Sequence, residues 1–196
     1  TDIVRTMADY YIESGVDILA AVDPMVSQIS PDHFNQFLKE PYTKIFNHIR
    51  QQGVLSSLFV CGDASGNIEP MCTTGPDGIA VDENVSLAQA KEITDQYEIV
   101  LEGNIPLTTV MLLGSQQDNM KWVIDALDSI SHDHLIISPG CDMPYDVPVE
   151  NTIAVEQAVH QPEQVREMVK NYQGEENPDI EVELPDYDNL SKPLVE

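Results

Sequence analysis

Positive charge is scarce in this 196-residue sequence, where nine Lys and Arg residues stand against 34 Asp and Glu, a formal net charge of −25. A surface with that balance repels phosphate backbones and anionic membrane surfaces. We therefore expect neither nucleic acid nor a membrane among the partners of this protein. The carboxylates alone are typical of a solvated acidic surface and indicate no particular ligand.

Long apolar runs are missing as well. No stretch approaches the roughly 20 apolar residues that cross a bilayer, and no basic segment followed by an apolar one opens the chain. The sequence thus predicts a soluble, cytoplasmic protein. It also contains neither a glycine-rich phosphate loop of standard spacing nor a Gly-x-Ser-x-Gly elbow, which argues against nucleotide binding and serine hydrolysis.

Cysteine occurs only at Cys61, Cys72 and Cys141. A disulfide framework needs more cysteines in a shorter secreted chain, so we expect reduced thiols. Taken alone, Cys61 and Cys141 fit three roles: metal ligands, inert buried thiols, or redox or nucleophilic groups. Cys72, in the short helical segment "EPMCTTG", is expected to pack against the sheet.

What is present is a regular alternation of helical and extended segments. The extended segments are apolar runs rather than in-out alternations, which predicts a parallel sheet covered by helices. They span residues 16–24, 54–63, 76–83, 97–106 and 133–144. The fold class is therefore α/β, either a doubly wound sheet or part of a (β/α)₈ barrel. Five strands do not close a barrel, so in that case the others lie upstream or elsewhere.

The remaining segments define the helices and the domain limits. Helical periodicity or capping covers residues 1–15, 30–53, 66–75, 86–96, 115–131 and 147–174, with a break expected at Pro41. Residues 1–173 read as one domain. Residues 174–196 hold many carboxylates and three prolines, which predicts an acidic extended tail or linker.

In both architectures, ligands bind at the carboxyl ends of the parallel strands. Those ends carry thiols, carboxylates and an amide: Cys61 with Asp63, then Asp82, Glu102 with Asn104, and Cys141 with Asp142. Thiolates and carboxylates are ligands that suit zinc. We expect the four carboxylates to bind substrate. The Asn104 amide can bind a ligand or merely cap the next turn.

Six segments, in order and in spacing, resemble the uroporphyrinogen decarboxylase superfamily. They are "GVDILAAVDP", "FLKEPYTKIF", "FVCGD", "GPDGIAVDE" followed by "SLAQAKE", "LEGNIP" and "SPGCDMPYDVPVENTIA". The resemblance covers about residues 1–160, the C-terminal half to two-thirds of such a domain. It implies a (β/α)₈ TIM barrel whose last five β-α units are present here, with the N-terminal strands upstream.

The superfamily has two main branches. Decarboxylases convert uroporphyrinogen to coproporphyrinogen and typically carry Gly-His-Gly where this sequence has Pro139-Gly140-Cys141. Zinc-dependent methyltransferases move methyl groups between a corrinoid protein and a thiol or other acceptor, and usually carry His-x-Cys-Gly and Gly-Cys. Cys61-Gly62 and Gly140-Cys141 match this second pattern, whereas Phe59 stands at the histidine position.

The resemblance therefore implies a methyltransferase in which Cys61 and Cys141 hold zinc, with the corrinoid on a partner protein. Glu102 is the expected third ligand, with Asp63 and Asp142 as alternatives, and Asn104 joins the cysteines as a catalytic candidate. Two other functions stay open. One is a uroporphyrinogen decarboxylase with a tetrapyrrole substrate; the other, favoured by Phe59, is a non-catalytic domain that binds a corrinoid or tetrapyrrole.

Overall fold

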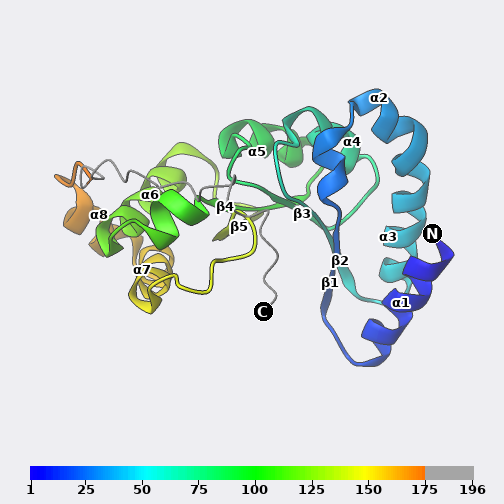
Figure 1. The fold of residues 1–196 in the computed structure, drawn as a ribbon, viewed down its shortest axis with the longest axis horizontal. Coiled ribbons are helices and arrows are strands. Elements are labelled where there is room, and N and C mark those ends of the chain that lie inside the picture. Colours follow the sequence, from blue (N-terminus) through cyan, green and yellow to red (C-terminus); the bar gives the residue numbers. More distant parts are fainter. Residues whose placement is uncertain (175–196) are drawn as a thin grey trace, which may run out of the picture.

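The computed structural model describes residues 1–174, which form one curved sheet with helices along it (Figure 1). Residues 175–196, most of the expected acidic tail, lie outside the described residues. The five strands are parallel and follow one another in chain order across the sheet. They are β1 (Ile18–Val22), β2 (Leu55–Val60), β3 (Gly78–Val81), β4 (Val100–Ile105) and β5 (Leu135–Pro139). The predicted parallel sheet is confirmed.

Helices separate the strands as the sequence predicts. The α-helices are α1 (Asp2–Glu13), α2 (Pro31–His33), α3 (Lys39–Gln51), α4 (Ile68–Cys72), α5 (Leu87–Gln96), α6 (Gln116–Ser129), α7 (Val149–His160) and α8 (Pro162–Val169). Short 3₁₀ turns, η1 (Pro24–Gln28) and η3 (Ser65–Asn67), and π-helical turns, η2 (Phe34–Leu38) and η4 (Leu107–Leu112), complete the described chain. Within residues 1–174, every helix is too short or too polar to span a membrane.

The break expected at Pro41 is wrong. The chain runs from α2 through η2 into α3 without interruption, and Pro41 lies in the first turn of α3. The π-helical turn η2 ends three residues before Pro41, so the regular i→i−4 pattern of hydrogen bonds is already shifted at this point. The helical run therefore continues through Pro41 instead of ending at it.

The helices cover one face of the sheet. Alternate strand residues are buried beneath them, namely Leu58, Val60, Ile79, Val81 and Leu101. Residues of the opposite face, such as Phe59, Ala80 and Glu102, stay partly exposed. Figure 1 shows the helices following the outside of the curve, from α1 and α3 over α4 and α5 to α6 and α7. A doubly wound sheet would carry helices on both faces, whereas a barrel wall carries them on one.

Two apolar clusters hold these layers together. The first packs α3, α4 and α5 against β1–β4 and contains the stacked rings of Phe34, Tyr42 and Phe46, with centroid distances of 6.1 and 5.6 Å. The second packs η4, α6, α7 and α8 around the carboxyl end of β4. Both cores thus lie between the sheet and its helices, and polar residues and thiols occupy the carboxyl edge of the strands.

Candidate functional site

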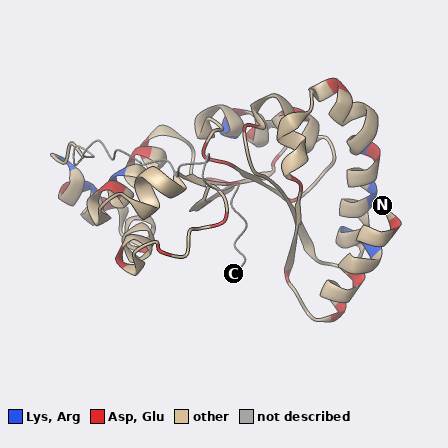
Figure 2. Cartoon of the chain, viewed as in Figure 1, with Lys and Arg blue, Asp and Glu red and all other residues tan. Residues whose placement is uncertain are grey.

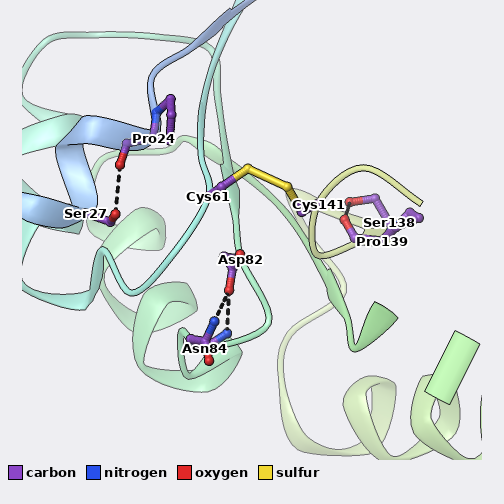
Figure 3. The surroundings of a disulfide bond; sticks show 8 residues. All are labelled: Pro24, Ser27, Cys61, Asp82, Asn84, Ser138, Pro139 and Cys141. Carbon is purple, nitrogen blue, oxygen red and sulfur yellow. Dashed lines mark hydrogen bonds between the residues drawn. A yellow bond between two sulfur atoms is a disulfide. The ribbon is translucent and has the colours of Figure 1, made fainter. Parts of the chain in front are cut away.

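Two of the predicted site residues meet at the carboxyl edge of the sheet. Cys61 follows the last residue of β2, and Cys141 lies two residues beyond β5. Although 80 residues separate them in sequence, their Cα atoms are 6.1 Å apart and their sulfurs form a disulfide (Figure 3). The expectation of reduced thiols is corrected at this pair. Curvature of the sheet brings together the ends of two strands that are not neighbours.

The glycine beside each cysteine has a steric reason. Gly62 has a φ of +87°, and a Cβ there would stand 2.7 Å from Ser27 Oγ. At Gly140, a Cβ would stand 2.7 Å from the backbone nitrogen of Glu83. Only glycine lets the chain after β2 approach η1, and the chain after β5 approach the end of β3, this closely. The glycine beside each cysteine therefore lets the chain pack closely against the neighbouring turn at both positions.

A carboxylate completes the group around the sulfurs. One oxygen of Asp82 and the sulfurs of Cys61 and Cys141 all lie within 4.8 Å of one another. The Asp82 side chain is almost buried, and its Oδ1 accepts hydrogen bonds from the backbone N–H of Asn84 at 2.9 Å and from the Asn84 amide (Figure 3). Asn84 is not among the residues predicted from the sequence, where its only signal is an Asp-x-Asn turn after a strand.

Glu102, the expected third ligand, lies elsewhere. It pairs with Ala80 and Ile136 within the sheet, and its Oε1 accepts a hydrogen bond from Ser57 Oγ at 2.7 Å. It is not a member of the three-residue group found among the described residues. Instead, Glu102 lines a cavity of about 210 Å³ together with Phe59, Cys141 and Asp142. This cavity adjoins the disulfide on the side of the sheet that carries no helix.

Asn104 is buried and uses its amide within the protein. Its Nδ2 donates hydrogen bonds to the carbonyl oxygens of Asp82 at 2.9 Å and Val85 at 2.7 Å. The amide nitrogen thus holds the turn that presents Asp82, which is the capping role. Three further buried asparagines donate in the same way to pairs of backbone carbonyls, namely Asn67, Asn119 and Asn151.

The other two expected carboxylates are exposed. Asp63 accepts hydrogen bonds from Ser65 Oγ at 2.6 Å and from the Ser65 backbone N–H at 3.0 Å, and these bonds lower its pKa. This side chain is thereby engaged in its own turn. Asp142 lines the cavity beside Cys141 and has the freer position of the two.

Positive charge stays away from this edge. Eight of the nine Lys and Arg residues are described, and Figure 2 shows them on the helices. They are Arg5, Lys39, Lys44, Arg50, Lys91, Lys121, Arg166 and Lys170, the last directly after α8. Among the described residues, the strand ends therefore carry carboxylates and sulfurs without a cation. Such a site attracts a metal cation and disfavours an anionic ligand.

The third cysteine differs from the pair. Cys72 closes α4, is 2% exposed and packs in the first apolar cluster, as the sequence predicts. Burial raises the pKa of its thiol to about 12.

A larger cavity of about 460 Å³, lined in part by Glu83, Trp122 and Asp125, lies by α6 and contains no cysteine in its lining. Size alone therefore does not mark the site.

Known proteins resemble this chain in sequence. The family model described as uroporphyrinogen decarboxylase (URO-D) matches residues 1–162. A methylcobamide:CoM methyltransferase, MtaA, of Methanosarcina barkeri is 28% identical over 159 residues, which are 79% of this chain and 44% of that protein. A uroporphyrinogen decarboxylase of Nostoc punctiforme is 25% identical over 151 residues, 76% of this chain and 42% of that protein.

A solved structure has a similar fold. A methyltransferase from Methanosarcina mazei matches with a TM-score of 0.74 and 26% identity, over 83% of this chain and 47% of that one. The chain spans less than half the length of each of these three proteins. It therefore corresponds to one part of a larger α/β barrel domain, and the five parallel strands with helices on one side are that part.

Proposed function

The chain belongs to the uroporphyrinogen decarboxylase (URO-D) family, and from this premise we propose that it forms part of a zinc-dependent methyltransferase. The enzyme would move a methyl group between a corrinoid, carried by a partner protein, and a thiol or similar acceptor in the cytoplasm. The convergence of Cys61, Cys141 and Asp82 carries this proposal. The relatives named as methylcobamide:CoM methyltransferases support the reaction class.

The donor set fits zinc once the cysteines are reduced. Two thiolates and one carboxylate are ligands that zinc accepts in tetrahedral sites, and three protein ligands leave the fourth position for a substrate. Phe59, at the position of the family's histidine, supplies no ligand, and Asp82 takes the third place instead. Bound zinc would lower the pKa of an acceptor thiol and so make it a better nucleophile.

The remaining residues position and separate the reactants. The Asn84 amide and backbone hold the carboxylate of Asp82, and Asn104 holds the turn that carries it. Partners of this kind around metal ligands fix ligand orientation. The 210 Å³ cavity beside Cys141 gives an acceptor of a few atoms a place to lie, with Glu102 and Ser57 as hydrogen-bonding groups on its wall.

The test uses the reduced full-length protein, loaded with zinc and freed of excess metal. We expect about one zinc per chain. We also expect an uncharged thiol such as 2-mercaptoethanol to demethylate methylcobalamin, a reaction measured by the change in corrinoid absorbance. Cys61→Ser and Cys141→Ser should each lose most of the zinc and the thiol-dependent reaction. Cys72→Ser, which alters a buried thiol outside the site, is the matched control and should keep both.

Zinc content that neither substitution changes would refute the proposed ligands. Methyl transfer that persists after zinc removal would refute the proposed role of the metal. Asp82→Ala refines the assignment, because we expect it to weaken zinc binding while Asp63→Ala, at an exposed carboxylate in its own turn, leaves it unchanged.

A second candidate function is decarboxylation of uroporphyrinogen, supported by the relatives of that name. The described strand ends carry no Lys or Arg, although a substrate with several carboxylates needs positive partners. Those partners would have to come from outside residues 1–174. Turnover of uroporphyrinogen to coproporphyrinogen by zinc-free protein would favour this function over methyl transfer.

A third candidate is a domain that binds a corrinoid or tetrapyrrole without catalysis, and Phe59 at the histidine position favours it. Tight corrinoid binding combined with no demethylation by any thiol tested would support it. The substitution Phe59→His then becomes informative, because restored zinc binding and methyl transfer would attribute the loss to this one position.

A further inference from the structure

The two sulfurs proposed as zinc ligands are joined to each other in the structure. A sulfur in a disulfide carries no thiolate, so the pair cannot hold a metal in that form. We propose that Cys61 and Cys141 are a thiol-disulfide switch, which oxidation converts from a metal-binding pair to a disulfide with release of zinc. This inference rests on the proposed function and adds regulation of the same site.

The backbone suits both states. The Cα separation of 6.1 Å lies within the range of about 4.4–6.8 Å seen for disulfides. The Asp82 oxygen remains within 4.8 Å of both sulfurs in the oxidised form, so the third ligand is still in place. Reduction therefore requires no movement of strands to recover the donor set, and the change is confined to the two cysteine side chains.

Solvent access differs between the Cys61–Cys141 pair and Cys72. Cys61 and Cys141 are each partly exposed, and Cys141 lines the open cavity. Cys72 is 2% exposed, and its pKa is raised to about 12 by burial. A thiol must be accessible and ionised to react with an oxidant. An oxidant can therefore react with Cys61 and Cys141 but not with the buried Cys72.

The chemistry balances with a low-molecular-weight disulfide such as oxidised glutathione. The thiolate of one cysteine attacks a glutathione sulfur, which forms a mixed disulfide and expels one glutathione thiolate. The second cysteine attacks the protein sulfur of that mixed disulfide and expels the other glutathione thiolate. Two electrons pass from the cysteine pair to the oxidant, and zinc leaves as Zn²⁺ with its charge unchanged.

This switch fits the proposed compartment. Cytosolic thiols are kept reduced, and disulfides found there are usually transient, catalytic or redox-sensing. A structural disulfide would serve no purpose in a site that requires free thiolates. The carboxyl edge of the sheet would therefore hold metal under reducing conditions and become inactive when the disulfide pool is oxidised.

The experiment follows zinc and thiols together in the full-length protein. The zinc-loaded, reduced protein is treated with oxidised glutathione, released zinc is measured with a chromogenic chelator, and peptide mapping locates the disulfides. We expect one zinc released for each Cys61–Cys141 disulfide formed, and recovery of zinc binding after treatment with a phosphine reductant and added zinc. Cys72→Ser should behave like the unmodified protein.

The outcomes separate the switch from the proposed function. Reduced protein that binds zinc through Cys61 and Cys141 but keeps it under oxidised glutathione would overturn the switch and leave the proposed function intact. Formation of only mixed disulfides with glutathione, or pairing of either cysteine with another residue, would likewise overturn it. Reduced protein that binds no zinc would overturn both.

Discussion

The carboxyl edge of the sheet and the short helix α4 each carry cysteine, in opposite environments. At the edge, Cys61 and Cys141 are partly exposed, adjoin a cavity and share an almost buried carboxylate. On α4, Cys72 is enclosed by the first apolar cluster, and burial raises its pKa to about 12. A cysteine thiol is therefore accessible to reagents at the edge of the sheet and inaccessible on α4. Its position in the fold determines its reactivity.

The largest expected effect is on thiol reactivity. In the reduced, zinc-free protein at pH 8, iodoacetamide should alkylate Cys61 and Cys141 about a thousandfold faster than Cys72, because a thiol of pKa about 12 is almost entirely protonated at that pH. The rate at Cys72 should rise about tenfold per pH unit below its pKa. Mass spectrometry of timed samples measures all three sites. Equal rates in the folded protein would remove the contrast.

The contrast between the two regions was only partly visible in the sequence. The parallel strands and the meeting of Cys61 with Cys141 could be predicted, because apolar runs indicate parallel strands and parallel strands end at one edge. The choice of a barrel over a doubly wound sheet came from the family resemblance and not from these patterns, and the cover of helices on one face agrees with it. Pro41 shows the limit of local rules, since a π-helical turn precedes it and the helical run continues through the position where proline predicts a break.

The next effect compares two phenylalanines. Phe46 on α3 is completely buried, whereas Phe59 on β2 is partly exposed and lines the cavity beside Cys141. We expect Phe46→Ala to lower the free energy of unfolding by about 3–5 kcal/mol and Phe59→Ala by about 1 kcal/mol. Denaturant unfolding of the full-length protein measures both. Similar losses would show that the edge is packed as tightly as the core.

The smallest effect compares two buried asparagines. Asn104 donates to the turn that carries Asp82, and Asn119 donates to carbonyls around the start of α6. Replacement of either by Ala should cost about 1–3 kcal/mol of stability. Only Asn104→Ala should also weaken zinc binding, by about 10- to 100-fold. Competition with a zinc chelator gives the affinity, and an equal loss in Asn119→Ala would indicate a general effect of instability.

For the proposed zinc site, the sequence indicated the two cysteines but not Asp82 as the third ligand. Cys61 and Cys141 could be selected because each follows an apolar strand next to glycine. The choice between Glu102 and Asp82 could not be made from the sequence, because both carboxylates lie near strand ends. The sequence does not show which of them lies within a strand and which lies in the turn after it. Glu102 pairs within β4 and bonds to Ser57, whereas Asp82 begins the turn after β3.

The most direct test of the central claim, that Cys61 and Cys141 hold one zinc ion together, is X-ray absorption at the zinc edge. The reduced, zinc-loaded full-length protein should show two sulfur neighbours at about 2.3 Å together with lighter ligands. Cys61→Ser or Cys141→Ser should remove one sulfur, and Cys72→Ser should change nothing. A zinc shell of nitrogen and oxygen alone, or one unaffected by both edge substitutions, would contradict the proposed centre.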